Sequence, residues 1–181
     1  MALLWLLTLI IQPLLIQRKQ WQLHRKIGML AHFILGLFFV SAILLTHYQQ
    51  SKDFHYIGVL IPFRDMTMIS LAYLIALKYR SIPGIHARGM IATGVAFIEP
   101  ALVRALGFMF PTMSNTYYWT IALIYLTLVV LTIAGRKYRM GQWVFPLILA
   151  LNMVFHSVIV FRIQVVWFER FAEWFISLPM S

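Results

Sequence analysis

The chain has 181 residues, of which 62% are hydrophobic and 11% are charged; its mean hydropathy is +0.84 and its net charge is +10. An average soluble domain is roughly 45–50% apolar and about 25% charged, so these side chains cannot cover a water-soluble globule. The absence of cysteine excludes disulfides, thiolate metal sites and iron–sulfur clusters. At about 20 residues per helical span, the length predicts one all-α membrane domain, residues 1–181.

Charge-free windows locate the membrane spans, because a charge at the bilayer centre costs about 2.5–3.5 kcal/mol. No segment alternates with a period of two, so every span is predicted as a helix of a polytopic transmembrane bundle. In chain order, the six predicted spans are 2–17, 26–47, 57–78, 86–110, 117–135 and 142–162. The first span is short, at ~24 Å against a hydrocarbon core of about 30 Å.

After the last span, residues 163–176 are predicted to form an amphipathic helix that lies in the outer membrane–water interface. Aromatic side chains recur there at helical spacing: Trp167, Phe171, Trp174 and Phe175. Aromatic belts anchor membrane proteins at the level of the headgroups. A docking surface for a partner membrane subunit is the alternative interpretation.

The basic residues indicate how the chain is oriented. Ten of the fifteen lie in three loops without an acidic residue: Arg18, Lys19, Arg25, Lys26, Lys78, Arg80, Arg88, Arg136, Lys137 and Arg139. By the positive-inside rule, these loops face the cytoplasm and both termini lie on the non-cytoplasmic side of a bacterial inner membrane. The net charge therefore predicts contact with anionic lipid headgroups on the cytoplasmic side. No nucleic-acid partner is expected.

Three motifs carry a resemblance to a known group. Residues 23–28 read Leu-His-Arg-Lys-Ile-Gly, residues 61–66 read Ile-Pro-Phe-Arg-Asp-Met, and one span combines residues 86–90, His-Ala-Arg-Gly-Met, with a Pro-Ala-x-x-Arg ending at Arg104. Over about residues 1–110 the chain resembles a group of uncharacterised bacterial inner-membrane proteins with a His-x-Arg-x-Met opening and a Pro-Ala-x-x-Arg ending in one helix. It departs from them at Gly89, where a bulkier residue is usual. The resemblance implies a polytopic inner-membrane architecture and names no reaction.

Charged side chains inside the spans are the main candidate site. If the hairpin of the spans at 57–78 and 86–110 turns near residues 79–86, Arg64 and Asp65 lie level with Glu99. In the span at 142–162, His156 lies 13 residues, or ~20 Å, beyond Trp143, in the same layer as Glu99. The whole predicted network, including a neighbouring amide one turn from the histidine, is Arg64, Asp65, Glu99, Arg104, His156 and Asn152.

The charges of two arginines and two carboxylates cancel in this layer. Such a balance is expected because a lone ion buried in the membrane is very costly. Glu99 and Arg104 lie about 140° apart around their helix, so we predict the cross-helix pairs Asp65–Arg104 and Arg64–Glu99. The network then either locks the helices together or forms a proton, ligand or quinone-headgroup site. A metal held by Asp65, Glu99 and His156 is a third alternative, but the arginines would repel a cation and no metal is predicted.

Two histidines suggest an alternative, a binding site for haem b. In membrane bundles this cofactor is held by two histidines at the same depth on facing helices. His24 and His86 both lie at the cytoplasmic edge of their spans, and their depths match. They are the candidate cofactor-binding residues of a haem- or quinone-associated redox membrane protein. No other cofactor is predicted.

The sequence contains no motif of a recognisable enzyme. Serine and threonine residues occur singly in the spans, and no phosphate-binding loop or zinc-protease pattern is present. We therefore expect a small non-catalytic membrane protein, either carrier-like or an accessory subunit, organised around the charge network. The redox protein is the alternative.

Overall fold

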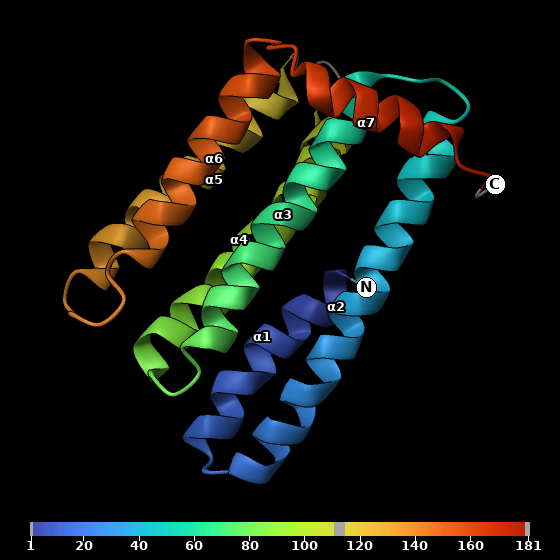
Figure 1. Ribbon diagram of the computed structural model, residues 1–181. Helices are drawn as coiled ribbons and strands as arrows, with labels where there is room; N and C mark the ends of the chain where they lie inside the picture. Colours follow the sequence, from blue (N-terminus) through green and yellow to red (C-terminus); the bar gives the residue numbers. More distant parts are fainter. Residues whose placement is uncertain (1, 111–114, 180–181) are drawn as a thin grey trace. The chain divides into compact units, whose positions relative to one another are not determined.

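A computed structural model describes residues 2–110 and 115–179, and within these ranges the only regular elements are helices (Figure 1). They are α1 Ala2–Gln17, α2 Trp21–Gln50, α3 Tyr56–Lys78, α4 Pro83–Met109, α5 Thr116–Gly135, α6 Val144–Val160 and α7 Val166–Ser177. The all-α prediction is confirmed. Helices α1 to α6 follow the predicted spans, and α2 begins five residues earlier than its span because helix continues beyond the apolar window.

Four helices, α2 to α5, are long and apolar enough to cross a membrane. The apolar helices α1 and α6 have 16 and 17 residues, which is about 25 Å of helix and less than a hydrocarbon core of about 30 Å. Large apolar side chains are exposed, among them Leu3 at 71%, Phe33 at 64% and Leu126 at 59%. Apolar exposure of this kind is typical of helices that face lipid. The described part of the chain is thus an all-helical bundle with four candidate membrane-spanning helices.

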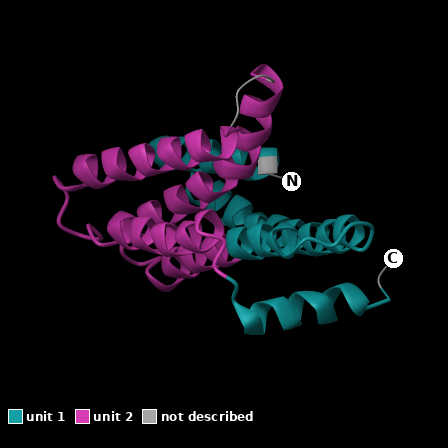
Figure 2. Cartoon of the chain, turned by 90° about the horizontal axis from the view of Figure 1, so that it is seen from above, with its two compact units in different colours: residues 1–66, 164–181 teal, residues 67–163 magenta. Residues whose placement is uncertain are grey.

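The chain divides into two compact units (Figure 2). Unit 1 contains residues 1–66 and 164–181, and unit 2 contains residues 67–163. Within unit 1, α2 packs against α1 and also contacts α7. Within unit 2, helices α4, α5 and α6 all contact one another.

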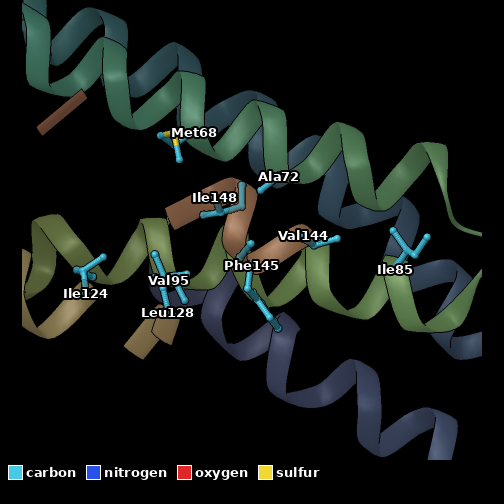
Figure 3. Packing of buried hydrophobic residues seen from close by; sticks show 10 residues of the cluster. Met68, Ala72, Ile85, Val95, Ile124, Leu128, Val144, Phe145 and Ile148 are labelled. Carbon is cyan, nitrogen blue, oxygen red and sulfur yellow. The ribbon is translucent and has the colours of Figure 1, made fainter. Parts of the chain in front are cut away.

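The core of unit 2 is a cluster of apolar side chains (Figure 3). It comprises Met68, Ala72, Ile85, Ala92, Val95, Ile124, Leu128, Val144, Phe145 and Ile148. Small residues bring α4 close to the second half of α3, since a Cβ on Gly89 would come within 2.8 Å of the backbone nitrogen of Ala76. Close backbone approach through small residues is a common mode of helix packing in membranes. It holds α4, which carries Glu99, firmly within unit 2.

Helix α7 docks within unit 1 through its phenylalanines. Phe168 and Phe175 are buried, and the ring of Phe63 on α3 lies 6.1 Å and 5.3 Å from their rings, centroid to centroid. Trp167 and Trp174 are 72% and 56% exposed. The predicted aromatic face of this helix is therefore divided: the phenylalanines contact the protein and the tryptophans point away from it.

Candidate functional site

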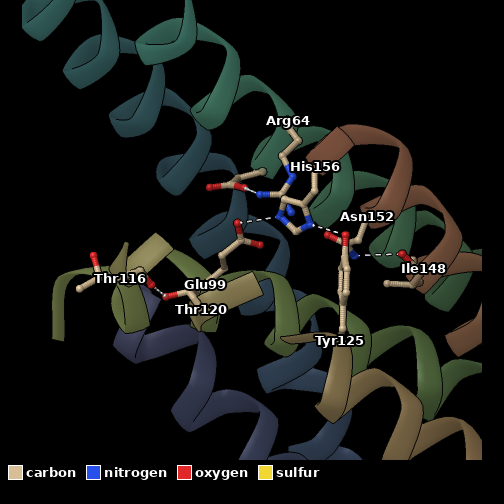
Figure 4. Close-up of polar contacts among 9 residues, drawn as sticks. Arg64, Glu99, Thr116, Thr120, Tyr125, Ile148, Asn152 and His156 are labelled. Atoms are coloured by element: carbon tan, nitrogen blue, oxygen red, sulfur yellow. Dashed lines mark hydrogen bonds and ion pairs between the residues drawn. The ribbon is translucent and has the colours of Figure 1, made fainter. Parts of the chain in front are cut away.

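Glu99 on α4 and His156 on α6 meet within unit 2 (Figure 4). His156 Nε2 lies 3.2 Å from Glu99 Oε1, and the two residues are only 2% and 4% exposed. The sequence places these two side chains at the same depth, and the structure brings them into contact. A carboxylate in such an apolar setting is stabilised by the imidazole, because an isolated buried charge would be far more costly.

Tyr125 on α5 extends this contact on the other side of the imidazole. Its hydroxyl oxygen lies 3.0 Å from His156 Nδ1, so both ring nitrogens have a polar partner from a different helix. Tyr125 is not part of the network predicted from the sequence, because an uncharged phenol gives no signal there. Tyr125 lies ten residues before the end of α5, and His156 lies twelve residues after the start of α6. The two residues are therefore at a similar level in this hairpin, and comparing levels along the two helices identifies Tyr125 as a neighbour of His156.

The three side chains, which we call the polar chain, can be hydrogen-bonded in two directions. With the imidazole proton on Nε2, His156 donates to the Glu99 carboxylate and its Nδ1 accepts from the Tyr125 hydroxyl. With a protonated Glu99 and the imidazole proton on Nδ1, Glu99 donates to Nε2 and His156 donates to the tyrosine oxygen. A chain that can reverse its donors in this way is suited to moving a proton.

The surrounding polar groups bond within their own helices. Asn152 is buried one turn from His156, and its Nδ2 donates to the carbonyl of Ile148 at 2.9 Å. The fully buried Thr120 hydroxyl donates to the carbonyl of Thr116 at 3.0 Å. Such bonds are the usual way to satisfy polar side chains in apolar helices.

The other predicted charges are placed differently. Arg64 and Asp65 pair with each other within unit 1, with Arg64 Nη1 3.1 Å from Asp65 Oδ1. Arg104 is exposed, and within unit 2 it forms no ion pair with a described residue. The predicted pairs Asp65–Arg104 and Arg64–Glu99 would join the two units and stay predictions.

The two candidate haem ligands lie in different units, so their pairing also stays a prediction. His86 Nδ1 donates to the carbonyl of Ala76 at 2.9 Å. The backbone carbonyl of His24 accepts from Gln12 Nε2 at 3.2 Å. Among the residues that the structure describes, no three histidine or acidic side chains form a group that could hold a metal ion.

Arg88 forms a second polar cluster, toward the start of α4. It is 6% exposed and donates to the carbonyl oxygens of Gly135 at 2.8 Å, of Tyr138 at 3.0 Å and of Met140. From its sequence position Arg88 is expected among the basic loop residues, but in the structure it is buried and anchors the loop between α5 and α6. Its acceptors are backbone atoms some 50 residues away, and no sequence pattern marks them.

Arg88 and the polar chain thus have different characters. The guanidinium satisfies backbone carbonyls, which is a structural role, whereas the titratable side chains of Tyr125 and Glu99 each contact the imidazole of His156. The polar chain is therefore the candidate functional site. No protein-family model, curated protein or solved structure matches this chain.

Proposed function

We propose that this protein is a small carrier-like or accessory protein of the inner membrane in which the polar chain binds and passes a proton. One observation carries the proposal: three proton-exchanging side chains are hydrogen-bonded in series across three apolar helices. Ionisable groups at membrane depth are expensive, and they commonly mark proton relays.

The transfer needs no group beyond the three side chains and an incoming proton. Tyr125 gives its hydroxyl proton to His156 Nδ1 while Nε2–H gives its proton to the Glu99 carboxylate. The incoming proton then restores the tyrosine hydroxyl, and Glu99 releases its proton on the other side. Before the next transfer the imidazole must return from the Nδ1–H to the Nε2–H tautomer, which resets the direction of the chain. The contacts of 3.0 Å and 3.2 Å are short enough for each transfer. One proton moves for each cycle, and no bond between heavy atoms changes.

We further propose that α1 and α6 complete six membrane spans and that both termini lie on the non-cytoplasmic side. The ten basic residues in and beside the three connections α1–α2, α3–α4 and α5–α6 support this orientation. Anionic headgroups on the cytoplasmic side and, for an accessory protein, a partner membrane subunit are the partners that fit it. In this arrangement the polar chain lies within the bilayer.

Replacing Glu99 with Gln should abolish the proton pathway, because the amide keeps the size of the side chain but cannot take up a proton. In proteoliposomes that enclose a pH-sensitive dye, a potassium diffusion potential should drive proton entry with the wild-type protein. The E99Q variant should reduce this rate at least about tenfold, since a positioned proton-transfer group is commonly worth more than that. The matched control is E173Q, which changes an exposed carboxylate on α7.

Two results would contradict the proposal. Wild-type proteoliposomes that take up protons no faster than empty liposomes would show that the chain by itself has no proton pathway. An E99Q variant with unchanged proton entry but a lower unfolding temperature would show that Glu99 and His156 only hold α4 and α6 together.

The position of α7 at the membrane surface can be tested through its two exposed tryptophans. In variants that retain a single tryptophan, Trp167 or Trp174 should be quenched more strongly by lipids brominated near the headgroup than by lipids brominated near the bilayer centre, because tryptophan prefers the interface. A variant that retains only Trp5, which is 1% exposed, should be quenched weakly by both lipids. If Trp167 and Trp174 behave like Trp5, α7 does not lie in the interface.

A further inference from the structure

Five cationic side chains gather at one end of unit 2. Two lie at the turn between α3 and α4, and three lie in the loop between α5 and α6; this basic patch comprises Lys78, Arg80, Arg136, Lys137 and Arg139. All five are exposed, and neither segment contains an acidic residue. Among the described residues, none of the five takes part in an ion pair. The patch therefore has a net charge with no counter-ion from its own unit.

The two segments of the basic patch are held against each other. Arg88 binds the carbonyls of Gly135, Tyr138 and Met140 from within α4. At the start of α4, a Cβ on Gly84 would lie 3.2 Å from the carbonyl oxygen of Met140. The ring of Tyr79 lies 6.0 Å from that of Trp143, edge to face. The loop is thus held against the turn, so the two segments that carry the five charges lie side by side.

Arg88 also changes what the loop presents to a ligand. The last carbonyls of a helix form the negative end of its dipole and would repel an anion. Here the guanidinium of Arg88 donates hydrogen bonds to the carbonyl of Gly135, the last residue of α5, and to two carbonyls of the loop. The exposed side of the loop consequently presents cations, which favours an anionic ligand.

Apolar and aromatic side chains lie among these cations. Tyr138 and Met140 are each 67% exposed, and Trp143 is 43% exposed. A free phosphate would neutralise the charges but would leave these side chains in water. A phospholipid satisfies both kinds of group, because its anionic headgroup meets the cations while the glycerol and upper acyl chains cover the apolar side chains.

We propose that the basic patch is a binding site for the headgroup of an anionic phospholipid, with Tyr138, Met140 and Trp143 contacting the lipid below its phosphate. This site is independent of the polar chain and does not require that the protein move protons.

The test measures binding of phosphatidylglycerol, phosphatidylcholine and inorganic phosphate to the purified full-length protein by native mass spectrometry in mild detergent. A patch variant changes Arg136, Lys137 and Arg139 to Gln. A matched control removes the same charge from unit 1 by changing Arg18, which follows α1, and Arg25 and Lys26, in the first two turns of α2, to Gln; all three are exposed. Wild type should prefer phosphatidylglycerol over phosphatidylcholine, and inorganic phosphate should not displace the lipid.

The patch variant should bind phosphatidylglycerol about a hundredfold more weakly, from the contribution of three cations near an anionic surface, whereas the control should bind nearly as wild type does. A third variant, R136K/R139K, keeps the charge and should retain binding even if the triple Gln variant folds poorly. Equal weakening in the patch and control variants would overturn the site in favour of diffuse attraction. Displacement of the lipid by inorganic phosphate, or equal binding of the two lipids, would also overturn it.

Discussion

Replacing Arg88 with Gln should be the most destabilising removal of a single charge in this protein. The change leaves the carbonyls of Gly135, Tyr138 and Met140 without their donor. A hydrogen bond to a charged group contributes about 1.5–3 kcal/mol, so losing the bonds of the guanidinium should lower the free energy of unfolding by roughly 3 kcal/mol or more. Thermal unfolding in detergent, followed by tryptophan fluorescence, measures this loss.

The matched control is R139Q in the loop that Arg88 anchors. Arg139 is exposed, so its replacement should change the unfolding free energy by less than about 0.5 kcal/mol. R88K should recover only part of the stability, because a single ammonium group lacks the planar fork with which a guanidinium reaches several acceptors. Unfolding of R88Q at the wild-type temperature would show that the loop does not depend on this anchor.

Gly89 should tolerate no side chain, and Gly89→Ala should destabilise unit 2 by about 1–3 kcal/mol, the usual cost of overpacking. The new Cβ would lie 2.8 Å from the backbone nitrogen of Ala76 and 2.9 Å from the carbonyl oxygen of Ala72. Neither atom can rotate away, so α3 and α4 must separate. Thermal unfolding again gives the size of the effect, and loss of the His86–Ala76 hydrogen bond should accompany it.

Gly107 on the same helix provides the control, because a Cβ there would meet nothing within 4 Å. Gly107→Ala should leave stability unchanged or raise it by up to about 1 kcal/mol, since alanine favours helix over glycine. The two substitutions are chemically identical, but only Gly89→Ala should lower the stability. If both raise the unfolding temperature, the second half of α3 does not pack against α4 as closely as the structure shows.

The helices could be predicted because apolar composition and charge-free windows reflect a single requirement, that backbone polar groups in a membrane be satisfied within helices. The ends of the helices were harder to predict. Helix α2 runs from Trp21 to Gln50 although its apolar window is shorter, because a helix can continue through polar residues beyond the bilayer. Hydropathy locates the apolar part of a helix, which matches the hydrocarbon core of a membrane. It says little about where the backbone leaves the helical conformation.

The candidate site was only partly predictable. Glu99 and His156 could be matched because the rise of a helix converts residue number into depth. Depth says nothing about direction around the helix axis, so it could not show that Arg64 contacts Asp65 or that Arg104 is exposed. Tyr125 could not be predicted as a site residue, because an uncharged phenol is not distinctive in an aromatic-rich chain. Only the structure shows its hydroxyl beside His156.

The sequence by itself determined the apolar helical class of the protein, the approximate course of its helices and the common level of Glu99 and His156, because these follow from composition and from regular helical geometry. Only the tertiary structure decided which side chains meet. Arg88 illustrates the difference: its charge is visible in the sequence, but its role depends on three carbonyl groups that every residue possesses and that only the packing of α4 against the α5–α6 loop brings within reach. Backbone acceptors carry no signature in the sequence, so contacts to them are determined by the fold.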